Sequence, residues 1–155
     1  MYIERKIKTM DKEYLKDREQ MRYKENVERI LWNYRRNVYK ASELREMIKD
    51  ITSVSGQSYG GHIVNGVSSP VFEVVNRKLR MEKKLAGTEK KIRVVDSLID
   101  SLDERELEMY QVLRILRSRY IKHREPDSVM RELVLTKTTY YRRNRELLRR
   151  AEKFI

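Results

Sequence analysis

The chain contains no cysteine, which excludes disulfide bonds, thiolate metal sites and a cysteine nucleophile. It has only 5 glycines and 2 prolines, the residues that interrupt helices most often. No apolar run approaches the length of about 18 residues that crosses a membrane, and the charged N-terminal sequence has no secretory signal. These absences favour long, charged helices in a cytoplasmic protein without a membrane partner.

Charged residues are abundant and unevenly distributed. They make up 39% of the 155 residues, and the formal net charge is +12. Residues 114–155 alone hold thirteen Lys and Arg but five Asp and Glu, a net charge of +8. Such a local excess of positive charge favours an anionic partner, with nucleic acid ahead of an anionic membrane.

The first part of the chain has the pattern of two long amphipathic helices. Residues 10–52 contain no glycine or proline, and their apolar side chains recur mostly every three or four positions, which predicts one long helix. Residues 53–69 are rich in Gly and Ser and predict a loop. Pro70 then begins a second helix, with Ser69 as its cap and an interruption at Gly87–Thr88. Two such helices form an antiparallel hairpin, whose apolar stripes need another copy or a partner for completion.

The last third predicts three shorter helices. Asp103 and Glu106 have the spacing of a capping box and mark the start of the first one. Glu125–Pro126 ends it, because the residue before proline avoids helical geometry. A short helix follows over 126–133, then a turn at Val134–Leu135 and a last helix capped by Thr136. The sequence therefore predicts an all-α chain, with a coiled-coil-like helical hairpin at 1–101 and a helix-turn-helix domain at 102–155.

The last helix has two chemically different sides. At about 100° per residue, one side gathers Tyr140, Asn144, Leu147, Leu148, Ala151 and Phe154, which we expect to be buried. The other side carries threonines and arginines, which suit DNA because arginine can bind guanine edges and threonine can bind phosphate. The predicted DNA-binding residues are Lys137, Thr138, Thr139, Tyr141, Arg142, Arg143, Arg145 and Arg149. Lys137, Tyr141 and Arg143 are expected to contact the backbone. Basic residues at the end of the preceding helix extend this surface: Arg117, Arg119, Lys122 and Arg124.

Other site chemistries have little support. His62 and His123 are the two histidines of the chain and have no ligand-spaced partner, so we expect no metal site. The glycines near Gly56 lack the phosphate-loop pattern, and no residues are arranged as a catalytic triad. Trp32 and most tyrosines are expected to pack. The prediction is a protein without catalytic residues, metal or cofactor.

Three quoted segments carry a family resemblance. LDERELEMYQVLRILRSRYI and PDSVMRELVLTKTTYYRRNRELLRRAEKF resemble region 4 of sigma-70-type factors and, more closely, phage-encoded ArpU/RinA-like transcriptional regulators. Upstream, YRRNVYKASELREMIKDITSVSG extends the resemblance to residues 30–155. The resemblance implies a coiled-coil-like arm before a sigma-like helix-turn-helix. It also implies an activator of late phage genes that binds promoter DNA in the bacterial host cytoplasm.

Three positions depart from the pattern of that family. Its scaffold helix usually has a small residue where this chain has Met130, and its turn has glycine where this chain has Val134. Tyr140 replaces a smaller aliphatic residue. These departures predict a wider or differently turned motif.

Two other functions stay open at this stage. A DNA-packaging subunit like a phage small terminase also joins a helix-turn-helix to a helical hairpin, although the DNA-binding part usually comes first. A non-enzymatic coiled-coil adaptor with a solvated basic tail would need no DNA. The regulator hypothesis adds double-stranded DNA as a partner, with RNA polymerase or a second copy of the chain bound through the hairpin.

Overall fold

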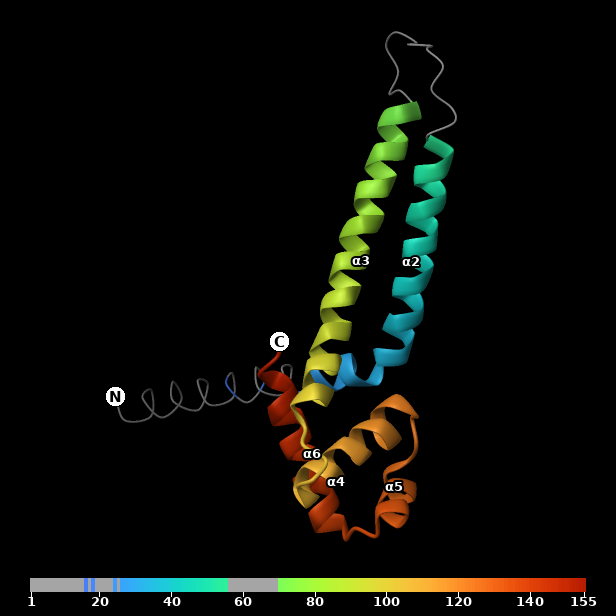
Figure 1. The fold of residues 1–155 in the computed structure, drawn as a ribbon. Helices are drawn as coiled ribbons and strands as arrows, with labels where there is room; N and C mark the ends of the chain where they lie inside the picture. Colours follow the sequence, from blue (N-terminus) through green and yellow to red (C-terminus); the bar gives the residue numbers. More distant parts are fainter. Residues whose placement is uncertain (1–15, 17, 19–23, 25, 56–69) are drawn as a thin grey trace, which may run out of the picture.

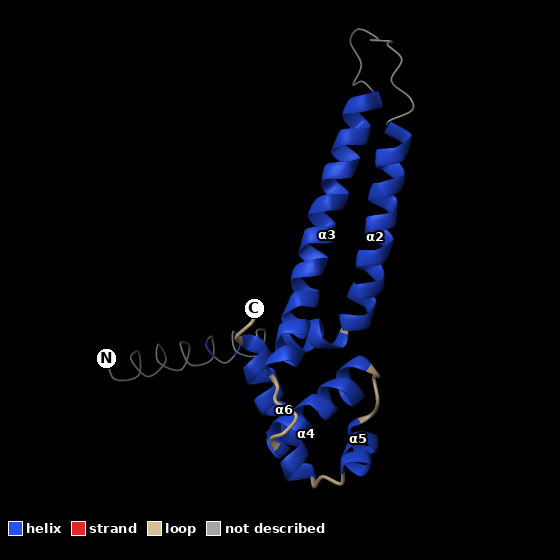
Figure 2. Ribbon diagram, viewed as in Figure 1, coloured by secondary structure: helices blue, strands red, loops and turns tan. Residues whose placement is uncertain are grey.

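The computed structural model describes residues 16, 18, 24, 26–55 and 70–155, and no strand occurs among them. The all-α expectation is therefore confirmed for these residues (Figure 2). After a helical segment at 26–32, the elements are α2 (Tyr34–Ser55), α3 (Pro70–Ser101), α4 (Leu107–Ile115), the π-helical segment η1 (Leu116–Ile121), α5 (Pro126–Leu133) and α6 (Lys137–Glu152). We call α2 and α3 the arm, and α4, η1, α5 and α6 the head.

The two helices of the arm run side by side in opposite directions (Figure 1). Near the head, the Tyr34 hydroxyl donates to Asp96 Oδ1 at 2.6 Å, and further along Arg45 pairs with Glu89 at 3.0 Å. Burial and the bond to Asp96 raise the pKa of Tyr34 to about 12, so its hydroxyl stays protonated at neutral pH. The break predicted at Gly87–Thr88 does not occur. Helix α3 continues through these two residues, and the Thr88 hydroxyl donates to the Lys84 carbonyl at 2.9 Å.

The single helix predicted over 10–52 is wrong in its described part. The helix over 26–32 ends in a turn at Asn33, and α2 begins at Tyr34 in a new direction (Figure 1). The bend places Val27 and Leu31, which are 2% and 0% exposed, into the core. A straight helix would carry these side chains away from the head, so their burial explains the change of direction. Most of the predicted helix before residue 26 lies outside the described residues.

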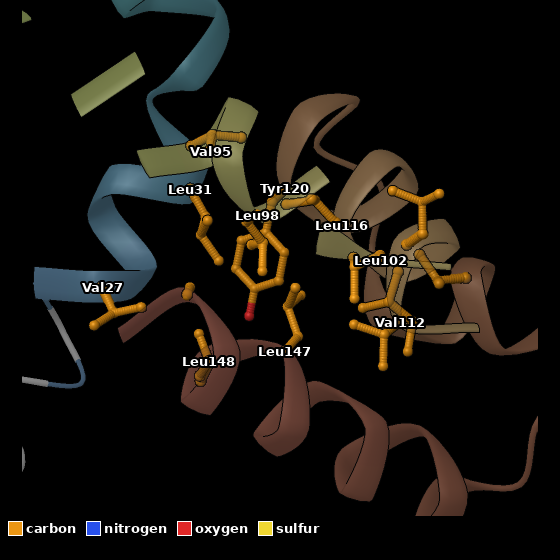
Figure 3. Close-up of a cluster of buried hydrophobic side chains, with 14 of the residues drawn as sticks. Val27, Leu31, Val95, Leu98, Leu102, Val112, Leu116, Tyr120, Leu147 and Leu148 are labelled. Carbon is orange, nitrogen blue, oxygen red and sulfur yellow. The ribbon is translucent and has the colours of Figure 1, made fainter. Parts of the chain in front are cut away.

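One apolar core joins the arm to the head. Tyr120 of η1, Leu98 of α3 and Leu147 of α6 belong to this core, and Figure 3 shows the Tyr120 hydroxyl directed towards α6. The Tyr120 hydroxyl donates to Asn144 Oδ1 at 2.7 Å, so the polar group of this buried ring is satisfied. This cluster contains buried residues from both sides of position 102, where the sequence predicts a domain boundary.

The shared core predicts where the fold is most sensitive to truncation. Leu98→Ala removes a side chain with 0% exposure and should lower the free energy of unfolding by about 2–5 kcal/mol. Met47→Ala, at a side chain with 42% exposure on α2, should change it by less than about 1 kcal/mol. Urea unfolding followed by circular dichroism would measure both. Equal losses at the two positions would contradict the shared core.

Candidate nucleic-acid interface

Helix α4, the first of the head, begins at Leu107, later than the cap predicted at Asp103. The Asp103 carboxylate accepts hydrogen bonds from the backbone N–H and the side chain of Arg105, both at 3.1 Å, and these bonds lower the pKa of Asp103. Glu106 occupies the N-cap position of α4 but forms no side-chain cap bond. The predicted capping box is therefore wrong, because the Asp103 carboxylate closes a turn with Arg105 before the helix begins.

The connection between α5 and α6 follows the predicted order. Pro126 occupies the first turn of α5, and the N–H of Leu135 donates to the Met130 carbonyl at 2.9 Å as that helix ends. Thr136 caps α6, since its Oγ1 accepts a bond from the Thr139 N–H at 3.3 Å. The turn at Val134–Leu135 and the Thr136 cap are thus confirmed.

Val134 takes the backbone conformation that glycine would adopt without strain. Its φ of 53° and ψ of 47° lie in the left-handed region, and its side chain is 89% exposed. A β-branched residue is unfavourable there because its Cβ approaches backbone oxygen. The valine therefore adopts this left-handed turn at a conformational cost.

Buried contacts hold one side of α6 against the head. Tyr140, Leu147 and Ala151 are at most 2% exposed, as predicted for this side, whereas Phe154 lies beyond the helix and is 39% exposed. Burial raises the pKa of the Tyr140 hydroxyl. The Arg143 guanidinium, whose side chain is 13% exposed, bonds Glu108 Oε1 and Gln111 Oε1 of α4, both at 2.9 Å. Arg143 therefore joins α6 to α4.

A carboxylate also fixes α5. Glu132 accepts a hydrogen bond from Arg114 of α4 at 2.9 Å and another from Arg124, in the loop between η1 and α5, at 2.6 Å. Partial desolvation would raise the pKa of Glu132, but the charges of Arg124 and Arg114 and the bond to Arg124 hold it below its usual value. Charge-assisted bonds therefore hold α5, the helix before α6, to the rest of the head.

The opposite side of α6 presents a straight stripe to solvent. We call the outer stripe the residues Thr138, Arg142, Arg145 and Arg149, which are all exposed and lie four, three and four positions apart. Within the described part of the chain, Arg142 and Arg145 have no hydrogen-bond or ion-pair partner for their side chains. Arg149 pairs with Glu146 at 3.0 Å. The outer stripe extends over about 16 Å at 1.5 Å per residue.

The remaining predicted residues have separate places. Lys137 is exposed at the first turn of α6. Thr139 is half-buried, and its hydroxyl accepts from the Thr136 hydroxyl at 2.9 Å, so it belongs to the helix cap. Tyr141 is 41% exposed on the flank, with its ring edge-on to Tyr140. The structure thus brings Lys137, Thr138, Tyr141, Arg142, Arg145 and Arg149 to the surface and leaves Arg143 engaged with α4.

A contact that the sequence did not predict lies beside this flank. The rings of Trp32 and His123 stack with centroids 3.8 Å apart, and the Arg119 guanidinium lies over Trp32 at 4.9 Å. His123 follows the C-cap of η1 and has a φ of 59°, and its Nε2 lies 2.8 Å from the Trp32 carbonyl oxygen. The residues are 91 positions apart, so no local pattern could reveal the stack.

A hollow of about 500 Å³ opens next to this stack. Its walls come from the 26–32 segment, the end of η1, the start of α5 and the first turns of α6, and they include Arg29, Trp32, Arg119, Pro126 and Tyr141. Two guanidinium groups and one carboxylate, that of Glu28, line it. The hollow therefore combines positive charge with aromatic surface.

The described residues contain no group of three or more His, Cys, Asp or Glu side chains that could hold a metal ion. None of the described helices is long and apolar enough to span a membrane.

A family model described as "Protein of unknown function (DUF1492)" matches residues 59–152, which is more than half of the chain. No curated protein and no solved structure matches.

The left-handed turn generates a stability prediction. Val134→Gly should raise the free energy of unfolding by up to about 1 kcal/mol, because glycine tolerates this φ and loses no contact at an exposed site. Val38→Gly, at an exposed position inside α2, should lower it by about 1 kcal/mol. Urea unfolding of both variants provides the measurement. A destabilised Val134→Gly protein would show that the turn is not strained.

Proposed function

This chain belongs to the DUF1492 family, and we propose that it is a sequence-specific DNA-binding transcription regulator similar to the phage ArpU/RinA-like proteins. In this proposal α5 and α6 form the helix-turn-helix, and α6 enters the major groove of promoter DNA. The observation that carries the proposal is the outer stripe, an exposed row of threonine and arginine on a helix whose opposite side is held in the core.

The chemistry of the outer stripe suits base recognition. A helix of about 10–12 Å diameter fits the major groove, which is about 12 Å wide. Arg142 and Arg145 have no side-chain partner among the described residues, so they can form bidentate bonds with guanine O6 and N7 without breaking a contact within the protein. Thr138 can contact phosphate or a thymine methyl group at the helix N-terminus.

Other residues of the predicted set serve the same interface differently. Lys137 and Tyr141 flank the outer stripe and can bind the sugar-phosphate backbone, which positions the helix without reading sequence. Arg149 can exchange Glu146 for a phosphate or a base. Arg143 is assigned to holding α6 on α4, because both sides of its guanidinium are engaged by Glu108 and Gln111.

The arm is proposed to associate with a second copy of the chain, because α3 carries large apolar side chains that are exposed. Val75 and Leu79 are 48% and 57% exposed, one turn apart on the same side of the helix. A two-fold axis would place this side against the same side of the second copy, so that Val75 of one copy could contact Leu79 of the other, and the reverse. RNA polymerase is the alternative partner for the same surface.

Variants of the outer stripe test the proposed base contacts. On a duplex selected from random sequence, Arg142→Ala and Arg145→Ala should each cost about 1–3 kcal/mol of binding free energy and relax the sequence preference. Fluorescence anisotropy on selected and unrelated duplexes would measure the change. Lys40→Ala, at an exposed position of the arm, is the matched control and should bind like wild type. Equal affinity of the wild type for every duplex would refute base recognition.

Lys137→Ala is expected to act on all sequences alike. Loss of one phosphate contact should weaken binding to selected and unrelated duplexes by the same factor, and reduce the slope of log K against log salt by about one. The same anisotropy titrations at several salt concentrations give this slope. An effect confined to the selected duplex would assign Lys137 to base contact instead.

The association of the arm has its own test. Sedimentation velocity should show a dimer of the wild type and a shift to monomer for Leu79→Glu, while Arg77→Gln on the same helix should remain dimeric. A monomeric wild type at every concentration would contradict self-association through α3. A large closed ring would instead favour the packaging function.

A further inference from the structure

We propose that the hollow beside Trp32 binds a phosphate of the DNA backbone, so that the segment before the arm forms part of the nucleic-acid interface. This inference rests on the proposed function, and it adds a site that lies outside α5 and α6. Arg29 and Arg119 both line the hollow, although they lie 90 positions apart in the sequence.

Arg119 is held in place before any ligand arrives. Its Nη1 donates to the Arg124 carbonyl at 2.9 Å, and its Cζ lies over the Trp32 ring, 4.9 Å from the ring centroid. A guanidinium has five N–H donors, and that bond uses one of them. A positioned arginine with donors to spare binds phosphate at a lower entropic cost than a flexible side chain.

Arg29 and Tyr141 complete the donor set from two other elements. Arg29 is exposed, and its guanidinium has no hydrogen bond or ion pair with any described residue, although its carbonyl accepts from Asn33. The Tyr141 side chain is 41% exposed and lines the same hollow. Arginine and tyrosine are both frequent donors to phosphate oxygens in complexes with DNA.

The place of the hollow matches the path of a DNA strand. Tyr141 precedes Arg142 of the outer stripe, so the hollow adjoins the flank of α6. When a helix lies in the major groove, a sugar-phosphate strand borders it on each flank. A duplex read by Arg142 and Arg145 therefore brings one of its strands to the hollow. Pro126, which also lines the hollow, lies in the first turn of α5, and the N-terminal end of a helix favours an anion.

Glu28 carries the opposing charge in the hollow, so its substitution and that of Arg29 have opposite expected effects. It is the carboxylate among the lining side chains, against two guanidinium groups. A phosphate bound there would be repelled by Glu28 and attracted by Arg29, although the two residues are adjacent in sequence. Neutralising either one should therefore change DNA affinity in opposite directions, whereas a disturbance of the local fold would weaken binding in both cases.

The test compares Arg29→Gln and Glu28→Gln with Arg36→Gln, a control at an exposed position of α2 that does not line the hollow. Arg29→Gln should lower the affinity for selected and unrelated duplexes by the same factor. It should also reduce the slope of log K against log salt by about 0.9, the value for one phosphate. Glu28→Gln should raise affinity, and Arg36→Gln should leave it unchanged. Circular dichroism of each variant checks the fold.

A chemical variant of the DNA identifies the contacted phosphate. Replacing single phosphates by neutral methylphosphonates along the selected duplex should reveal one position at which wild type and Arg29→Gln bind equally. An unchanged salt slope in Arg29→Gln, alongside the reduced slope of Lys137→Ala, would overturn the phosphate site and leave the proposed function intact. Absence of salt-dependent DNA binding by the wild type would overturn both. Binding of inorganic phosphate or an acidic peptide to the hollow, without any effect of Arg29→Gln on DNA, would also reject the site.

Discussion

The arrangement of this molecule depends on the burial of one tyrosine at the junction of arm and head. Tyr120 lies in one buried cluster with Leu98 of α3 and Leu147 of α6 (Figure 3), and its hydroxyl is satisfied by Asn144 on α6. Because the ring touches the arm and the last helix together, neither can change its orientation without exposing apolar surface or leaving a buried hydroxyl unpaired. The direction in which α6 presents its arginines is therefore set by contacts on its opposite side.

Polar contacts around that core divide the basic residues into two groups. Arg114, Arg124 and Arg143 have carboxylate or amide partners within the head, and these contacts fix α5 and α6 on α4. Arg142 and Arg145 project from the same region with no such partner among the described residues. The net charge of the chain does not distinguish these five arginines. Their partners distinguish the side chains that maintain the fold from those available to a polyanion.

Local signals in the sequence predicted much of this structure, and non-local contacts account for the rest. The apolar spacing predicted the helices of the arm, and Pro126, Thr136 and the stripe through Leu147 predicted α5, its turn and the buried side of α6. The bend at Asn33 was missed because it follows from burying Leu31 against distant residues. The Trp32–His123 stack joins positions 91 apart, so no local pattern in the sequence indicates it.

The continuous helix α3 gives the molecule a mechanical property. Its 32 residues correspond to about 48 Å at 1.5 Å per residue, and its last turns belong to the same core as α6. A body attached to the far end of α3 is thereby held at a nearly constant separation from whatever α6 touches. The length of the arm therefore sets that separation. Adding or removing one heptad would move the attachment point by about 10 Å and would keep the same side of the helix facing α2.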